Sequence, residues 1–144
     1  MSDRCSAVLE TVRLTILAAV RGLATETRDE GPRRMLDVGC WDGSATRAYA
    51  EAFRAAALGV EIFDGPAAEA RRRALEVAQL DLEADSFPWP DASVDLVIAN
   101  QVFEHLKNVW LPMAEMVRVL RPGGWLIVSV PNLSSLHNRI MLLF

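Results

Sequence analysis

The sequence has little cysteine, and its two cysteines do not form a metal-binding pattern. Cys5 and Cys40 are the only cysteines among 144 residues, and they stand far apart. Structural zinc sites need cysteines or histidines in close pairs, so the spacing does not indicate a site of this kind. A chain of this length can bury a core without disulfides, and free thiols in such a chain are typical of a reducing compartment. We therefore expect a cytoplasmic protein.

Long apolar runs and basic clusters are missing as well. No stretch approaches the roughly 18 apolar residues that a membrane helix needs. The N-terminal region is interrupted by charged and hydroxyl residues, unlike a signal peptide. The net charge is −4, and the densest positive cluster, Arg71 to Arg73, fits a solvated helix face. The sequence therefore predicts no membrane span and no nucleic-acid partner.

No internal repeat or low-complexity segment divides the chain. Hydrophobic residues make up 51% and charged residues 24%, which is an ordinary balance for a globular protein. The length fits one domain. We expect a single domain over residues 1–144, with an N-terminal helix and loop over 1–34, a core over 35–131 and a C-terminal helix over 132–144.

The spacing of apolar residues predicts helices and strands in alternation. The predicted helices cover 7–23, 45–57, 65–74, 109–120 and 134–144. The predicted strands cover 35–38, 58–63, 77–80, 94–99 and 125–130. Strands that are apolar throughout are buried on both faces, as in parallel sheets. With right-handed crossovers, the pattern predicts an α/β fold: a Rossmann-like, doubly wound, mainly parallel sheet of about five strands with flanking helices.

Two prolines fix the reading of 87–91 as a turn, because they exclude a helix and a central strand. Three further breakers, Pro122, Gly123 and Gly124, are expected to end the helix before the fifth strand.

A glycine-containing loop follows the first predicted strand. Gly39 lets the backbone approach a ligand, and Gly43 lets the next helix begin close to the strand, with Ser44 as its cap. The N–H groups at a helix start favour a carboxylate. Ligands of open parallel sheets bind at the carboxyl ends of the strands. The alternative is that both glycines are only turn residues.

Polar residues also follow the second, third and fourth predicted strands. Glu61 ends the second strand, where an acid accepts hydrogen bonds from ribose hydroxyls in dinucleotide-binding folds. Asp81 follows the third strand and would accept from an amino group such as that of adenine. Val102 or Phe103, after the fourth strand, would cover a flat base. The alternatives are a surface acid at Glu61 and a helix-cap or loop acid at Asp81.

Four segments, 36–43, 59–62, 87–97 and 120–128, together carry a resemblance to a known family. In their order and spacing the chain resembles class I S-adenosylmethionine-dependent methyltransferases of the small-molecule kind, similar to methyltransferase type 11. The resemblance implies methyl transfer from S-adenosylmethionine to an unidentified small-molecule acceptor, with S-adenosylhomocysteine as the product.

The resemblance also implies roles for matching residues. Asp37 and Gly39 would hold the methionine end of the cofactor, in a loop that includes Cys40, Trp41 and Gly43. Glu61 would bind the ribose, and Ile62 would pack on adenine. Asp81 and the Leu82 backbone would meet the adenine edge. The residues that would line the sulfonium side are Asn100, Gln101 and Val102.

His105 is a candidate general base, and the alternative is a structural histidine between helix and loop. Some members of the resembled family carry Glu-x-x-Glu-His here and bind a divalent metal. In this sequence Gln101 replaces the first acid, although Glu104 keeps the second. An amide is a weaker ligand than a carboxylate, so we expect no metal.

The chain departs from the family pattern at two places. Trp41 stands where the loop usually has a glycine, so the indole would partly roof the pocket. Such enzymes usually continue through two more strands, whereas this chain stops after five. An apolar edge at 125–130, followed by an apolar C-terminal helix, would then be covered by a second copy of the chain. The alternative is a piece of a longer chain.

Two other functions compete with methyl transfer. One is an S-adenosylmethionine-binding module that is inactive alone and needs a partner, which the missing strands favour. The other is a nicotinamide dehydrogenase, but the loop 39–43 does not fit the G-x-G-x-x-G pattern of that class.

Overall fold

Helices and strands alternate in the computed structural model, which describes residues 2–26 and 31–131, with side chains described from Leu9 onward. The helices are α1 (Ser2–Glu26), α2 (Ser44–Phe53), α3 (Asp64–Arg72), the 3-10 turn η1 (Phe103–His105) and α4 (Trp110–Val119). The strands are β1 (Arg33–Val38), β2 (Ala55–Glu61), β3 (Glu76–Gln79), β4 (Val94–Asn100) and β5 (Leu120–Ser129). The predicted C-terminal segment, 132–144, lies outside the described residues.

The five strands form one parallel sheet in the order β3-β2-β1-β4-β5. From β1 the chain moves outward through β2 to β3, and then returns to the other side of β1 with β4. The order therefore reverses between β1 and β4, and the predicted α/β doubly wound fold is confirmed. β5 forms one edge of the sheet, as the sequence analysis expected.

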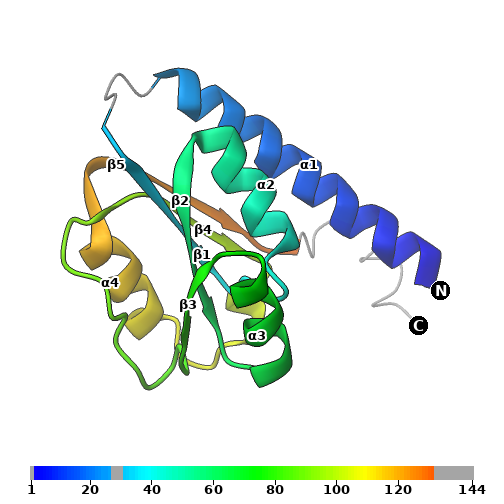
Figure 1. The fold of residues 1–144 in the computed structure, drawn as a ribbon. Coiled ribbons are helices and arrows are strands. Elements are labelled where there is room, and N and C mark those ends of the chain that lie inside the picture. Colours follow the sequence, from blue (N-terminus) through cyan, green and yellow to red (C-terminus); the bar gives the residue numbers. More distant parts are fainter. Residues whose placement is uncertain (1, 27–30, 132–144) are drawn as a thin grey trace.

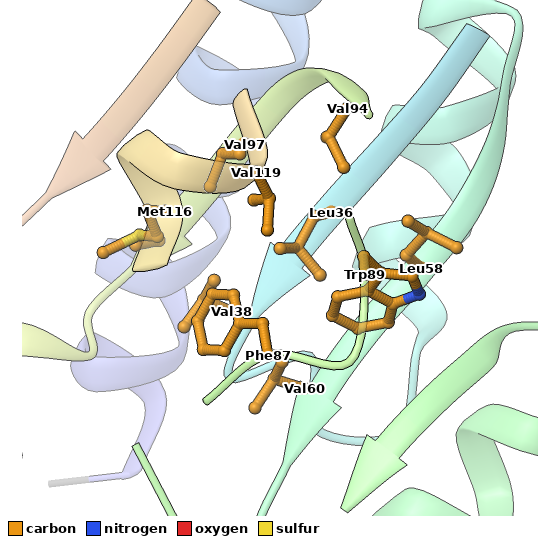
Figure 2. Close-up of a cluster of buried hydrophobic side chains, with 11 residues drawn as sticks. Leu36, Val38, Leu58, Val60, Phe87, Trp89, Val94, Val97, Met116 and Val119 are labelled. Atoms are coloured by element: carbon orange, nitrogen blue, oxygen red, sulfur yellow. The ribbon is translucent and has the colours of Figure 1, made fainter. Parts of the chain in front are cut away.

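Helices cover both faces of the sheet, with α1, α2 and α3 on one side and α4 on the other (Figure 1). On the α4 side, Met116 and Val119 pack on β1, β2 and β4 together with Phe87 and Trp89 of the predicted turn (Figure 2). On the opposite side, α1 and α2 pack on the same central strands through residues such as Phe53. Residues 94–99 are all buried, Asp95 included, which fits the mainly apolar sequence of β4.

The predicted boundaries at both ends of β2 are wrong. The helix predicted over 45–57 ends at Phe53, where Arg54 takes a left-handed conformation with φ 59°. Ala55 to Ala57 favour helix locally, but they pair with Arg33 to Met35 in the sheet. At the other end, β2 stops at Glu61, so Ile62 and Phe63 lie beyond the strand and are exposed.

Two local predictions are also wrong. Ser44 is the first residue of α2 and not its cap. Gly43 holds the cap position, and the Asp42 carboxylate accepts the Ser44 backbone N–H at 3.0 Å. The residues Pro122 to Gly124 do not separate helix from strand, because β5 begins at Leu120. They lie instead in a register shift between the β4 and β5 pairings.

Candidate functional site

A cavity opens at the carboxyl ends of the strands, where the sheet order reverses. Its volume is about 600 Å³, within the range of small-molecule sites. Its walls come from the segments that follow β1, β2, β3 and β4. The predicted site residues that line it are Gly39, Trp41, Glu61, Ile62, Asp81, Leu82, Asn100, Gln101, Val102 and His105. The structure therefore brings together residues from four separate predicted motifs.

The loop after β1 forms the first wall. Trp41 has φ 49°, a left-handed conformation that glycine adopts more readily than any other residue. The backbone conformation therefore explains why the resembled family usually has a glycine at the position of Trp41. The indole is 59% exposed and makes an edge-to-face contact with Phe63, with the ring centroids 6.2 Å apart. Both aromatic residues line the cavity, as a partial roof would require.

Gly39 and Gly43 serve packing as well as turning. Both have positive φ, at 77° and 76°. A Cβ at Gly39 would lie 2.7 Å from a methyl of Val102, so the two loops meet there. A Cβ at Gly43 would lie 3.0 Å from Ala70 and Leu75. Gly43 therefore accommodates the region around α3, which differs from the predicted helix–strand contact.

Glu61 joins the ends of β1 and β2. The residue is only 5% exposed, yet it lines the cavity. One carboxylate oxygen accepts the Trp41 N–H and the other accepts the Phe63 N–H, both at 3.0 Å. An ionised carboxylate has about four acceptor positions. Two therefore remain for donors from a ligand.

Asp81 lies in a tight turn after β3. One oxygen of its carboxylate accepts the Glu83 N–H at 2.9 Å, and its own N–H donates to Asp85 at 2.8 Å. Asp81 is exposed and lines the cavity beside Leu82. The turn thus presents a carboxylate and backbone groups to the cavity together.

The segment after β4 carries an unpaired acceptor. Asn100 lines the cavity, and its buried Oδ1 has no hydrogen-bond partner among the described residues. Buried polar atoms are normally paired, so a ligand donor is expected there. Gln101 has φ 55° and donates from its side chain to Ser129 Oγ at 3.1 Å. Its left-handed conformation follows the end of β4, and the next residue, Val102, also lines the cavity.

Asp37, Cys40 and Gly43 are not among the residues that line the cavity, although the sequence predicted a role there. Asp37 is buried, and Thr46 donates to it at 2.5 Å. Burial, together with the nearby charge of Glu61, raises the pKa of Asp37 to about 7. Burial also raises the pKa of the Cys40 thiol to about 12, so it is protonated at neutral pH. These residues support the loop from behind.

His105 and Glu104 lie on η1, and both are exposed. Of the two, His105 lines the cavity and Glu104 does not. In residues 2–26 and 31–131, no group of three or more His, Cys, Asp or Glu side chains is arranged to hold a metal ion. The role of His105 as a base remains a prediction.

The sequence analysis missed several residues of the cavity wall. They are Val60, Phe63, Leu80, Glu83 and Leu106. Leu80 and Glu83 adjoin Asp81, so their proximity to the site was a usable signal. Phe63 was placed inside a strand, and nothing in the sequence pairs Leu106 with the segment after β3.

The cavity wall carries acidic side chains without basic ones among the described residues. The carboxylates of Glu61, Asp81 and Glu83 line it, and within the described part of the chain no Lys or Arg does. Such a wall attracts cationic ligands that are rich in hydrogen-bond donors and disfavours phosphates.

None of the helices in the described ranges combines the length and the apolar character that crossing a membrane requires.

Comparison with protein families gives a match over residues 36–128 to a family described as a methyltransferase domain. The match begins in β1 and ends in β5, so it includes every strand tip that surrounds the cavity.

Two curated relatives show the same similarity. A probable S-adenosylmethionine-dependent methyltransferase of Mycolicibacterium smegmatis is 37% identical over 100 residues, covering 69% of this chain and 38% of the relative. A trans-aconitate 2-methyltransferase of Methylobacterium nodulans is 36% identical over 112 residues, covering 76% of this chain and 43% of the relative. The chain thus spans less than half the length of either relative.

The fold has a solved counterpart. An N-methyltransferase of Haemonchus contortus, in complex with phosphomonomethylethanolamine and S-adenosylhomocysteine, matches with a TM-score of 0.64 and 23% identity. The match covers 79% of this chain and 27% of that one. At this identity the likeness concerns the fold.

Proposed function

Because this chain belongs to the methyltransferase domain family, we propose that it binds S-adenosylmethionine in the cavity and transfers the methyl group to a small-molecule acceptor. The observation that carries the proposal is the set of acceptor groups at the strand tips: Glu61, Asp81 and the unpaired Oδ1 of Asn100. S-adenosylmethionine offers ribose hydroxyls, amino groups and positive charge, which match these acceptors.

The residues have distinct parts in this proposal. Glu61 has acceptor positions left for the ribose hydroxyls, and Asp81 with the Leu82 backbone faces the adenine edge. Ile62 is 51% exposed beside the cavity and offers an apolar surface to the adenine ring. Asn100 and Val102 lie toward the sulfonium side.

When bound, S-adenosylmethionine supplies a methyl group on a positively charged sulfur, and S-adenosylhomocysteine is left. The protein's task is then chiefly to position the acceptor and to exclude water. His105 is exposed at the cavity wall, where a side chain can take a proton from an acceptor. No cationic wall binds an anionic acceptor in the described part of the cavity, so we propose a neutral or cationic acceptor.

Calorimetry with S-adenosylhomocysteine tests the proposal. We expect a dissociation constant in the micromolar range, which corresponds to a binding free energy on the order of −8 kcal/mol. NAD should bind far more weakly, because the acidic wall repels its phosphates. Tighter binding of NAD would overturn the proposal.

The Glu61→Ala variant tests the site. It removes charge-assisted hydrogen bonds worth roughly 1.5–3 kcal/mol each, so the affinity should fall at least tenfold. The Glu104→Ala control, which removes an exposed carboxylate outside the cavity wall, should bind as the wild type does. Equal affinities of Glu61→Ala and the wild type would show that Glu61 does not contact the ligand.

A second candidate function is a cofactor-binding module that methylates only in an assembly. The exposed apolar residues of β5 and its end favour it: Trp125 is 40%, Val128 41% and Val130 55% exposed. We propose that a second copy of the chain covers this edge. The predicted contribution of a C-terminal helix concerns residues outside the described ranges and remains a prediction.

A further inference from the structure

The Glu83 side chain connects two walls of the cavity that are distant in the sequence. Its Oε1 atom accepts the backbone N–H of Lys107 at 2.9 Å and that of Asn108 at 2.7 Å. Glu83 belongs to the turn after β3, whereas both donors lie between η1 and α4. One carboxylate oxygen thus holds two consecutive amides of another segment.

The Glu83 end of this connection is fixed. The Glu83 N–H donates to Asp81 at 2.9 Å, and the Asp81 N–H donates to Asp85 at 2.8 Å. The backbone N–H of Asp85 closes the turn on the Asp81 carbonyl at 2.8 Å. The carboxylate therefore projects from a well-braced turn that also presents Asp81 and Leu82 to the cavity.

The other end of the connection adjoins a second part of the cavity wall. His105 and Leu106 line the cavity immediately before Lys107. Asn108 in turn accepts the Trp110 N–H at 3.0 Å with its side chain, at the start of α4. Residues 106–109 belong to no helix or strand, so the two bonds to Glu83 set where this short connection runs.

We propose that Glu83 is a positioning residue, which fixes the His105–Leu106 wall of the cavity relative to the turn at Asp81. The proposal rests on the proposed function only for the identity of the ligand. A ligand that contacts the braced Asp81 turn is then coupled to the wall at His105, because one carboxylate connects the two. Glu83 thereby links occupancy of the adenine side to the geometry of the acceptor side.

Three variants separate this role from a general contribution to folding. Glu83→Ala removes both acceptor bonds. Glu83→Gln keeps a carbonyl oxygen that can accept the same two N–H groups. Glu104→Ala removes a nearby exposed carboxylate that does not line the cavity.

Residue-resolved amide hydrogen exchange, with and without S-adenosylhomocysteine, gives the readout. In the free protein, Glu83→Ala should speed exchange at Lys107 and Asn108 at least tenfold. Glu83→Gln should restore most of the protection, and Glu104→Ala should match the wild type. S-adenosylhomocysteine should slow exchange over 105–108 in the wild type and in Glu83→Gln, but not in Glu83→Ala.

Each contrary result has a definite meaning. Unchanged exchange at Lys107 and Asn108 in Glu83→Ala would overturn the proposal, and so would equal exchange in the two Glu83 variants. Faster exchange spread evenly over the sheet would show a structural role alone. If the wild type does not bind S-adenosylhomocysteine, the proposed function fails, while the comparison of the free proteins still decides whether Glu83 holds the wall.

Discussion

At the scale of single residues, the two buried carboxyl groups nearest the loop after β1 have different tasks. Glu61 lines the cavity and has acceptor positions to spare. Asp37 is buried behind the loop, with the Thr46 hydroxyl as its side-chain partner. Its pKa of about 7 follows chiefly from burial. A buried acid without a cation beside it prefers its neutral form.

The raised pKa of Asp37 makes the stability of the fold depend on pH. In the unfolded chain the pKa is near the ordinary value of 3.8, so between about pH 4 and pH 7 the folded state binds more protons. The stabilisation that Asp37 contributes to the folded state through this difference is fully present below pH 4, and it is lost as the pH rises through 7.

Asp37→Asn, which cannot ionise, should therefore flatten this dependence. Above pH 7 it should raise the free energy of unfolding by roughly 4 kcal/mol relative to the wild type. Urea unfolding of both proteins at a series of pH values checks the prediction. Glu104→Gln is the matched control, because it removes the same charge at an exposed position. Parallel curves for Asp37→Asn and the wild type would show that Asp37 is ionised throughout.

At the scale of elements, the irregular segment 87–91 covers one sheet face where other α/β units place a helix. It is held by α4. The Glu115 carboxylate accepts the Phe87 N–H at 2.7 Å, and Arg118 donates to the carbonyls of Phe87 and Trp89, both at 3.0 Å. Arg118 also pairs with Glu115 at 2.6 Å. The pair lowers the pKa of Glu115, chiefly through the hydrogen bond from Arg118.

Glu115→Ala should loosen the segment, because it leaves the Phe87 N–H and the Arg118 guanidinium without this partner. Removing one member of a buried ion pair costs about 3 kcal/mol, and here the partial exposure of Arg118 makes ~2 kcal/mol the better figure. Chemical denaturation measures it. Glu10→Ala breaks an exposed pair with Arg13 and should cost under about 0.5 kcal/mol. Similar losses in the two variants would contradict this account.

The elements differ in how well the sequence alone predicts them. Short, mainly apolar segments such as 94–99 could be predicted as strands, because a sheet covered on both faces buries them. The boundaries at Ala55 and Leu120 could not be predicted, because sheet pairing overrides the local preferences of alanine, proline and glycine. In the site, Glu61, Asp81 and Asn100 could be predicted because each is a polar residue at the end of a predicted strand. The contact of Glu83 with Lys107 and Asn108 joins two loops, and no local pattern in the sequence signals it.

At the scale of the whole molecule, the two edges of the sheet are unlike. β3 is short and follows α3, whose last turn carries Arg71 and Arg72, whereas β5 is longer and carries apolar residues at the surface. Residues 125–129 of β5 carry no charge, and an uncharged apolar edge is a template for pairing.

Val128→Lys places a charge on β5 and should shift the proposed dimer to monomer, with S-adenosylhomocysteine affinity unchanged. Analytical ultracentrifugation over a range of concentrations measures the shift. Val117→Lys adds the same charge to an exposed position on α4 and should leave the assembly as it is. A wild-type protein that stays monomeric at ~100 μM, well above a micromolar dissociation constant, would refute the dimer.

The position of β1 between β2 and β4 also governs the order of events during synthesis. Met35 pairs with Ala57 early, but its other partner, Leu96, leaves the ribosome later, by several seconds at ~10 residues per second. In that interval the central strand has an open edge and the cavity lacks a wall. Because the cavity opens where the strand order reverses between β1 and β4, the nascent chain cannot form this cavity until β4 has been synthesised. Chaperones that recognise open, apolar strands have this interval in which to act.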